Sequence, residues 1–344
     1  MKTVLLLCGG RSEEHEISLI SAKCILDALD RNLYAPVVVG INKQGIWQLE
    51  KAEDFYEGEF RADSIRLKET LEYVSLSPYL HTNGRGRLIA EGRIIEFDVV
   101  FPILHGPFGE DGKLQGLLDM IGIPYVGSGC QSSAVCMDKA LTKAVCERLR
   151  IPVAPYQCLQ RPEDLDPSAV KFPAFVKPAR LGSSVGITRV TKLSDLEGAV
   201  KEAFRFDSKV LVEEGIRGRE IECAVLGDKV AAPGEIEVAS EIGWYSYEAK
   251  YLSKTAARTI VPAPLSADLT KQVQDVALQA FRGLECKGLA RVDLLVEKGT
   301  DKIYLNEVNT LPGFTPISMY PMMWQASGLT YTQLISSLLE LAQR

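Results

Sequence analysis

Side chains that could hold a metal ion lie close together near the C-terminal end of the sequence. Glu307 and Asn309 fall in "KIYLNEVNTLPGF", and Asp293 precedes them in another apolar stretch. Carboxylate and amide oxygens are hard ligands, which suit Mg²⁺ carrying substrate phosphates better than Zn²⁺ or a softer metal. Arg291 adds one cation beside them. This combination is typical of a site that handles phosphate groups.

Two β-strands joined by a hairpin would position these side chains. Successive side chains of a strand point to opposite faces, so Arg291 and Asp293 share one face of the first strand. By the same alternation Leu305, Glu307 and Asn309 share one face of the second. The connection between them is typical of a hairpin, and pairing would let the three candidate ligands converge. The alternative is that both strand ends are solvated and the ion pair is incidental.

A glycine- and serine-rich turn between two strands could cover a phosphate group. The stretch "FVKPARLGSSVGITRV" predicts a strand that ends at Lys177, followed by a turn that contains Ser183 and Ser184. Small residues let backbone N–H groups approach phosphate oxygens, and the hydroxyls add donors. The P-loop pattern G-x-x-x-x-G-K-[ST] and the dinucleotide pattern G-x-G-x-x-G are both absent from the sequence. A hairpin without a ligand is the alternative.

A third segment could recognise the base and ribose of a nucleotide. The stretch "KVLVEEGIRGREIECAVL" predicts a strand that runs into Glu213 and Glu214 and resumes near Glu220. A purine needs backbone donor and acceptor groups, an apolar wall, and an acceptor for the ribose hydroxyls. Glu213, Ile216 and Glu220 could supply these. A charged turn between two strands, with no ligand, is the alternative.

Composition limits the class of protein. The 344 residues are 46% hydrophobic and 24% charged, which is ordinary for a soluble protein of two or three domains. A net charge of -6 predicts no general attraction to nucleic acid or anionic membranes, so any phosphate site must be local. Eight cysteines without a C-x-x-C pair favour reduced thiols in a cytoplasm. Neither a signal peptide nor a transmembrane helix is expected.

Strand and helix signals alternate in the first third of the chain. The run "FDVVFPILHG" is apolar enough for a central parallel strand buried on both faces, which indicates an open α/β domain. Ligands of such sheets collect at the carboxyl ends of the strands, where "GGRSEEHEIS" and "HGPFGEDG" fall. The following "CQSSAVCMDKALTKAVCERLRI" has the apolar period of one helix.

The remaining chain predicts α+β structure. From about Phe172 to Glu214 we expect strand, turn, strand, helix and strand. Several short strands follow, then a helix from about Ser266 to Gly283 and the paired strands of the metal-ligand candidates.

The order of these segments resembles the ATP-grasp fold, in which ATP lies between two α+β lobes. Seven stretches between about residues 4 and 320 also resemble the D-alanine-D-alanine ligase family: "GGRSEEHEISLISA", "HGPFGEDGKLQGLLD", "GSGCQSSAVCMDKALTK", "KPARLGSSVG", "YSYEAKY", "GLARVDLL" and "NEVNTLPGFTPIS". The resemblance implies an enzyme that joins two D-alanines at the expense of ATP, through a D-alanyl phosphate, for peptidoglycan synthesis.

The resemblance also implies a division of the chain into three units. Residues 1–127 would form an N-terminal open parallel α/β domain that binds substrate. Residues 128–213 would form the central ATP-grasp lobe, and residues 214–344 the C-terminal lobe with the lid and the metal site. A lid is expected around "GWYSYEAKYLSKTAA", where closure would keep water from the acyl phosphate. The enzyme is expected to be a cytoplasmic homodimer that binds neither nucleic acid nor membrane.

Carried over by motif, the family's nucleotide and metal contacts fall on defined residues. Two Mg²⁺ ions, for which Mn²⁺ could substitute, would be held by Asp293, Glu307 and Asn309. The contacts to ATP would come from Lys139 and Lys177 at the α- and β-phosphates and from Ser183, Glu213, Glu214, Ile216, Glu220 and Lys250. Relatives often carry lysine where this chain has Glu214, which leaves the base contact there open.

The resemblance assigns further residues to transition-state stabilisation and to the second substrate. Arg291 would stabilise the transferring phosphoryl group and, with the backbone N–H of Gly313, the oxyanion of the tetrahedral intermediate. Ser318 and Lys250 would bind the carboxylate of the second D-alanine.

Four other residues would serve the first D-alanine and the attacking amine. Glu16 would take the ammonium group of the first substrate, and His105 would lie near the same molecule. Ser184 and Tyr251 would be linked to Glu16 by hydrogen bonds and would orient the amine.

Two rival functions remain. Another ATP-grasp carboxylate-amine ligase, or a ligase that forms D-alanyl-D-lactate or D-alanyl-D-serine, would differ at the lid residue Tyr251. A nucleotide-binding regulator without turnover should have lost at least one of Lys177, Arg291, Asp293, Glu307 and Asn309, and all five are present.

Overall fold

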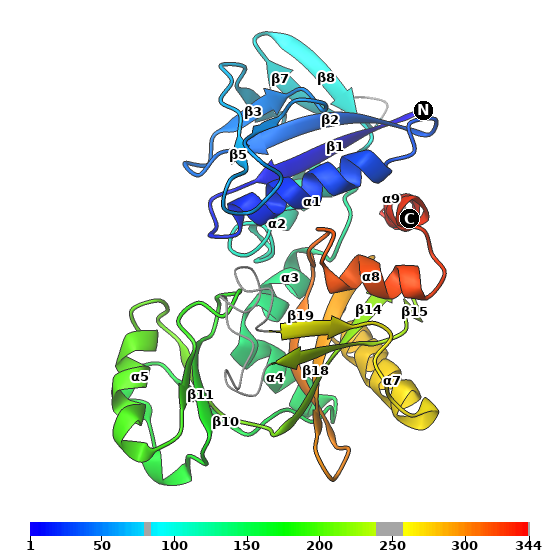
Figure 1. Ribbon diagram of the computed structural model, residues 1–344. Coiled ribbons are helices and arrows are strands. Elements are labelled where there is room, and N and C mark those ends of the chain that lie inside the picture. The colour runs from blue at the N-terminus through cyan, green and yellow to red at the C-terminus, as the bar shows by residue number, and fades with distance from the viewer. Residues whose placement is uncertain (79–83, 239–256, 343–344) are drawn as a thin grey trace.

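The computed structural model describes residues 1–78, 84–238 and 257–342. Three main sheets follow one another along the chain, each accompanied by helices (Figure 1). The N-terminal sheet lies at one end of the molecule, and the central and C-terminal sheets lie at the other. An N-terminal α/β domain and two α+β units are therefore confirmed.

A mostly parallel sheet forms the core of the N-terminal domain. Its strand order is β3–β2–β1–β9, and β1 is parallel to both β2 and β9. Strand β1 is buried from its third residue to its end, as expected of a central parallel strand. The edge strand β3 is antiparallel, which the sequence did not predict. The bounds are β1 (Lys2–Gly9), α1 (His15–Ala28), β2 (Tyr34–Ile41), β3 (Trp47–Glu50) and β9 (Val99–Pro102).

Two small antiparallel sheets lie between β3 and β9 in sequence. They pair β4 with β5 and join β6, β7 and β8 in that order. Helix α2 follows β9. The bounds are β4 (Tyr56–Glu57), β5 (Arg66–Leu67), β6 (Val74–Leu76), β7 (Gly86–Ala90), β8 (Arg93–Phe97) and α2 (Lys113–Ile121).

The segment predicted as one helix forms two. Helix α3 (Cys130–Met137) ends and α4 (Lys139–Arg148) begins at Asp138, whose backbone is extended. The Asp138 carboxylate accepts hydrogen bonds from the N–H groups of Ala140 and Leu141, which have no partner inside the helix. The prediction of a single helix was wrong here, because the apolar period continues across a break that the capping aspartate makes.

The central sheet is antiparallel, with strand order β10–β13–β11–β12. Helix α5 covers one face, where its apolar residues share a core with the strands. Strand β11 ends just after Lys177, and the predicted glycine- and serine-rich turn follows it. The bounds are β10 (Tyr156–Leu159), β11 (Ala174–Pro178), β12 (Thr188–Val190), α5 (Leu196–Ala203) and β13 (Val210–Glu214).

The C-terminal sheet has the order β17–β16–β14–β18–β19, with β15 paired to β14, and its pairs are antiparallel. Helices α7, α3 and α4 contact this sheet, and the residues between them form one apolar core. On the opposite face Glu222, Asp293 and Glu307 line a cavity, whereas Ala224 and Leu226 belong to a second apolar core. The bounds are β14 (Gly218–Leu226), β15 (Lys229–Val230), β16 (Gly234–Val238), β17 (Ala257–Ile260), α7 (Ala267–Gly283), β18 (Leu289–Glu297) and β19 (Ile303–Asn309).

A β-bulge in β19 changes which side chains share a face. Asp293 lies opposite Glu307, but the next residue, Leu294, lies opposite Leu305, so Asn306 is an extra residue in β19. Leu305 is buried in the apolar core, whereas Glu307 lines a cavity on the other face. The predicted common face of Leu305 and Glu307 was therefore wrong, because the bulge shifts the alternation by one residue.

The last two helices return to the N-terminal domain. Helix α9 (Tyr331–Leu341) lies beside α1 (Figure 1), and α8 (Met319–Ala326) packs on β14. Their apolar residues share a core with α1 and with β1 and β9. The two ends of the described chain therefore stabilise the same core. Within this part of the chain, every helix is too short or too polar to cross a membrane.

Candidate functional site

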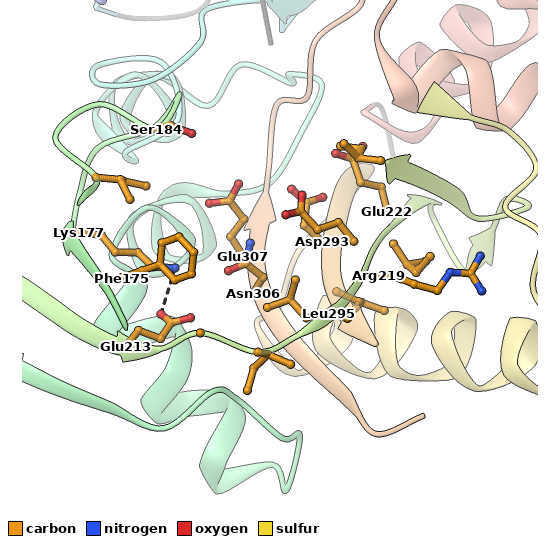
Figure 2. A pocket seen from close by; sticks show the side chains of 18 of the residues that line it. Phe175, Lys177, Ser184, Glu213, Arg219, Glu222, Asp293, Leu295, Asn306 and Glu307 are labelled. Atoms are coloured by element: carbon orange, nitrogen blue, oxygen red, sulfur yellow. Dashed lines mark ion pairs between the residues drawn. The ribbon is translucent and has the colours of Figure 1, made fainter. Parts of the chain in front are cut away.

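A cavity of about 500 Å³ lies between the central and C-terminal sheets. Figure 2 shows Lys177 and Glu213 on one side of it and Glu222, Asp293 and Glu307 on the other. Lysines on one wall and carboxylates on the facing wall suit a ligand that carries phosphate groups and a cation.

The predicted metal ligands come together across β18 and β19. Asp293 is paired with Glu307, and Arg291 with Asn309, so all four are cross-strand neighbours. The Asn309 amide donates a hydrogen bond to Asp293 at 3.0 Å. Within the described residues no group of three His, Cys, Asp or Glu side chains is arranged to hold a metal. Asp293 is instead occupied by Arg291, whose guanidinium donates two hydrogen bonds of 2.7 Å to it.

Sequence reasoning missed one carboxylate in this set. Glu222 on β14 is the cross-strand partner of Asp293 on the side opposite Glu307, so three carboxylates lie across three adjacent strands. Glu222 Oε2 is 3.1 Å from Arg291 Nε. Its only signal in the sequence was its spacing of two residues from Glu220, which places both on one face of a strand.

Arg291 is a buried cation held by carboxylates. Burial lowers the pKa of Arg291, but Asp293 and Glu222 outweigh burial and raise this pKa well above its ordinary value. Arg291 therefore stays charged at any physiological pH. A permanent positive charge on the cavity wall fits the predicted role in stabilising a transferring phosphoryl group.

Lys177 lies where the sequence predicted, at the end of β11 and on the cavity wall. Its ammonium group is 3.1 Å from Glu213 Oε2. The same oxygen is 3.2 Å from the ammonium group of Lys143, a second lysine that sequence reasoning did not single out. Burial raises the pKa of Glu213, but Lys143 and Lys177 outweigh burial and leave this pKa below its usual value. Glu213 is therefore ionised between two cations.

The loop after β11 has the backbone expected of a close approach to a ligand. Ser183, Ser184 and Gly186 have positive φ angles of 51, 60 and 70°. Serine rarely adopts such angles, and strained backbone of this kind is concentrated at ligand sites. Lys139 lies next to the loop, and its ammonium group donates a hydrogen bond of 2.6 Å to the Leu181 carbonyl oxygen. Lys139, Ser183 and Ser184 all line the cavity, as predicted for a phosphate-covering loop.

The segment predicted to contact base and ribose also reaches the cavity. Glu213, Glu214, Ile216 and Glu220 are all among its lining residues. The Glu214 carboxylate is 3.4 Å from the ammonium group of Lys171, so it is turned to a cation of the central lobe.

Glu14, rather than Glu16, is the carboxylate that faces the phosphate-covering loop. The Ser183 hydroxyl donates a hydrogen bond of 2.6 Å to Glu14. Glu16 lies in the first turn of α1, where it is 2.8 Å from Lys43 and 3.8 Å from Arg66. The predicted link between Glu16 and the loop was therefore wrong. Glu14 lies just before the helix, so its side chain points in a different direction from that of Glu16. The motif alone does not reveal this difference.

His105 and Glu110 connect the N-terminal domain to the chain after β19. The His105 ring nitrogen Nδ1 is 3.0 Å from the Leu311 carbonyl oxygen. Glu110 accepts hydrogen bonds from the N–H groups of Leu311, at 3.2 Å, and of Gly106, at 2.6 Å. Burial, with a contribution from Glu14, raises the pKa of Glu110 to about 8. Glu110 also lines a small cavity next to Glu307.

The two predicted residues beyond β19 lie against each other. An added Cβ at Gly313 would be 2.7 Å from the Ser318 hydroxyl oxygen, which is closer than real contacts allow. Ser318 Oγ accepts a hydrogen bond of 3.0 Å from the Thr315 N–H group. Lys250, Tyr251 and most of the expected lid lie outside the described residues.

Two family models match the chain. The one described as D-ala D-ala ligase N-terminus matches residues 3–128, and the one described as D-ala D-ala ligase C-terminus matches residues 145–340. A D-alanine–D-alanine ligase A from Chromobacterium violaceum is 44% identical, over 98% of this chain and 94% of its own length. A D-alanine–D-alanine ligase from Shouchella clausii is 42% identical, over 99% and 94%.

Two solved structures have a fold similar to that of this chain. A D-alanine-D-alanine ligase from Coxiella burnetii has a TM-score of 0.83 and 38% identity, covering 99% of this chain and 94% of its own. The VanG D-Ala:D-Ser ligase from Enterococcus faecalis has a TM-score of 0.85 and 34% identity, covering 99% of both chains. The ATP-grasp fold class predicted from the sequence is confirmed.

Proposed function

This chain belongs to the D-alanine–D-alanine ligase family, and on that premise we propose that it joins two D-alanines at the expense of ATP for peptidoglycan synthesis. The observation that carries this proposal is the cavity between the two α+β lobes. It has Lys139 and Lys177 on one wall, with Arg291, Asp293 and Glu307 on the other. A site of this kind suits phosphoryl transfer from a nucleotide to a carboxylate.

The reaction proceeds in two steps whose chemistry matches these walls. The γ-phosphoryl group of ATP is transferred to the carboxylate of the first D-alanine, which makes D-alanyl phosphate and ADP. The amine of the second D-alanine then attacks the acyl carbon, phosphate leaves, and the amine loses a proton. Both steps pass through states with concentrated negative charge, and Arg291, which stays protonated, stabilises that charge. Lys139 and Lys177 hold the phosphates of the nucleotide.

Asp293, Glu307 and Asn309 fit a divalent cation of the Mg²⁺ type. They supply hard oxygen donors from adjoining positions of two paired strands. Asn309 would present its amide oxygen in place of the N–H that now faces Asp293. When bound, Mg²⁺ neutralises charge on the β- and γ-phosphates. Two Mg²⁺ ions, with Mn²⁺ as a substitute, belong to this proposal.

Glu14 is proposed to take the ammonium group of the first D-alanine, the role that the family resemblance implied for Glu16. Its hydrogen bond from Ser183 supports this, because it ties the carboxylate to the loop that covers the phosphates. His105, which contacts the chain after β19, would lie near the same substrate. The backbone N–H of Gly313 would bind the oxyanion, and Ser318 with Lys250 the second carboxylate.

The division into residues 1–127, 128–213 and 214–344 remains part of the proposal, as do the lid, the homodimer and the cytoplasmic location. The packing of helices α3 and α4 argues against placing the start of the central lobe at residue 128. They belong to its proposed range but share their apolar core with β14, β18 and α7 of the C-terminal lobe.

A coupled ADP-release assay across D-alanine, D-serine, D-lactate and L-alanine tests the proposal. We expect turnover with D-alanine alone and no stimulation by L-alanine. Faster turnover when D-serine or D-lactate is added to D-alanine, with the mixed product detected by mass, would replace the second substrate but keep the ligase. No ADP release with any of the four would contradict the proposal.

A further inference from the structure

Lys143 is buried beside the nucleotide cavity without lining it. Its side chain is only 1% exposed, yet its ammonium group is 3.2 Å from Glu213 Oε2. Lys177 is 3.1 Å from that same oxygen and does line the cavity. Two cations therefore share one carboxylate oxygen, one facing the ligand space and the other sealed from it.

The local structure holds Lys143 in place independently of Lys177. Helix α4 places Lys143 one turn after Lys139, so the two lysines lie on one face of the helix. The Lys143 ammonium group also lies 5.6 Å from the centre of the Tyr156 ring, a cation–π distance. Tyr156 is the cross-strand partner of Glu213. A ring and a carboxylate on neighbouring strands thus fix this buried cation.

Burying three charges is costly unless they stay compensated. Burial lowers the pKa of Lys143 and the attraction of Glu213 opposes that effect, so each group depends on the other for its charge. An ionised carboxylate left alone in such a place would be strongly unfavourable. The pair Lys143–Glu213 is balanced by itself, and Lys177 is the additional cation.

We propose that Lys143 is a positioning residue that frees Lys177 for the phosphates of the nucleotide. In the structure Lys177 is paired with Glu213. When a nucleotide binds, the Lys177 ammonium group turns from Glu213 to the phosphate oxygens, and Lys143 keeps Glu213 compensated. Without Lys143 that turn would leave Glu213 buried and unpaired, so Lys177 would stay where it is. This inference rests on the proposed nucleotide site.

The test compares a ligand that needs Lys177 with one that does not. Binding of Mg²⁺–AMP-PNP and of adenosine is measured by isothermal titration calorimetry for wild type, Lys143→Met, Glu213→Gln and the double variant. We expect Lys143→Met to weaken the binding of AMP-PNP at least about tenfold more than that of adenosine. Without Lys143, the buried Glu213 carboxylate would lose its last partner when Lys177 turns to the phosphates. In the Glu213→Gln background the same Lys143 substitution should leave the ratio of the two affinities unchanged, since no carboxylate then retains Lys177.

Controls separate this role from a structural one. Lys201→Met removes a lysine from the surface of the same lobe, where it pairs with Glu197, and should change neither affinity. An equal loss for adenosine and AMP-PNP in Lys143→Met would overturn the inference, as would an altered ratio when Lys143→Met is added to Glu213→Gln. If Lys143→Met does not fold, the comparison of Glu213→Gln with the double variant still decides it. Failure of wild type to bind AMP-PNP would instead contradict the proposed function.

Discussion

The Ser183 hydroxyl donates a hydrogen bond of 2.6 Å to the Glu14 carboxylate, although the two residues are 169 positions apart in the sequence. This contact joins the start of the N-terminal domain to the phosphate-covering loop of the central lobe. Two parts of the chain that are proposed to bind different substrates are therefore held in register where those substrates must react.

Two neighbouring carboxylates give a matched test of this contact. Glu14→Gln keeps the shape of the side chain but removes the charge proposed to bind the ammonium group, so KM for the first D-alanine should rise about tenfold or more while KM for ATP changes little. Glu16→Gln removes only partly exposed ion pairs with Lys43 and Arg66, which should cost about 0.5–1 kcal/mol of stability and leave both KM values near wild type. The reverse pattern in steady-state kinetics would restore the original assignment of Glu16.

Replacement of Glu307 tests the proposed metal site. Glu307→Gln keeps the hydrogen-bonding shape but removes a charged oxygen ligand, so turnover at saturating Mg²⁺ should fall by about two orders of magnitude, or ~3 kcal/mol of transition-state stabilisation. Binding of Mn²⁺ with AMP-PNP, followed by water relaxation, should weaken as well. Glu297→Gln is the control, because Glu297 lies at the far end of β18 and pairs with Thr300. Near-normal turnover and Mn²⁺ binding in Glu307→Gln would exclude it as a ligand.

The close approach of Gly313 to Ser318 predicts a steric effect on catalysis. An alanine Cβ at position 313 would lie 2.7 Å from the Ser318 hydroxyl oxygen, so either the turn or this hydroxyl, which accepts a hydrogen bond from the Thr315 N–H group, must shift. We expect Gly313→Ala to lower kcat about tenfold or more, equivalent to ~1.4 kcal/mol or more. Gly198→Ala is a suitable control, since nothing lies within 4 Å of the added atom. Unchanged kcat in Gly313→Ala would show that the turn can move without cost.

The raised pKa of Glu110 predicts that the stability of the protein depends on pH. Its pKa is raised to about 8 from an ordinary value of 4.5 by burial and by Glu14. Between these values the folded protein holds a proton that the unfolded chain has lost, so the stability due to Glu110 is greatest below about pH 4.5 and falls as pH rises towards 8. The slope should approach about 1.4 kcal/mol per pH unit.

The measurement is urea unfolding of wild type and Glu110→Gln at several pH values from 5 to 9. Other groups titrate alike in both proteins, so the stability of wild type minus that of the variant should decline across this range and level off above about pH 8. Parallel pH profiles would show that Glu110 is ionised throughout.

The sequence was most informative where neighbouring segments interact. The hairpin of β18 and β19 lies where predicted and pairs Asp293 with Glu307, because alternation and a short turn fix such a pairing locally. The strand that ends at Lys177 and the loop after it follow from the same local signals. Contacts between distant segments were not predictable in this way. Glu222 is recognisable only once β14 is known to pair with β18, and Lys143 only once α4 is known to lie beside β13.

The start of α1 shows a finer limit. The motif contains several acidic residues within a few positions. Two positions are enough to separate a residue just before the helix from a residue in its first turn. Glu14 and Glu16 therefore meet different parts of the protein, the first the phosphate-covering loop and the second Lys43. The direction in which a side chain points at the start of a helix depends on backbone angles, and composition and spacing do not predict these angles.

The extra residue in β19 bends the strand without deciding on which face the metal-ligand candidates lie. Substitution of Asn306 keeps the bulge, so Leu305 and Glu307 stay on opposite faces of the sheet. Deletion of Asn306 would make Leu305 and Glu307 consecutive, and consecutive residues of a regular strand also point to opposite faces. Glu307 would therefore stay opposite Asp293, and Val308 would stay in the apolar core. What deletion would remove is the bend of the strand and the Asn306 side chain, which lines the cavity, so the bulge sets the contour of the cavity wall.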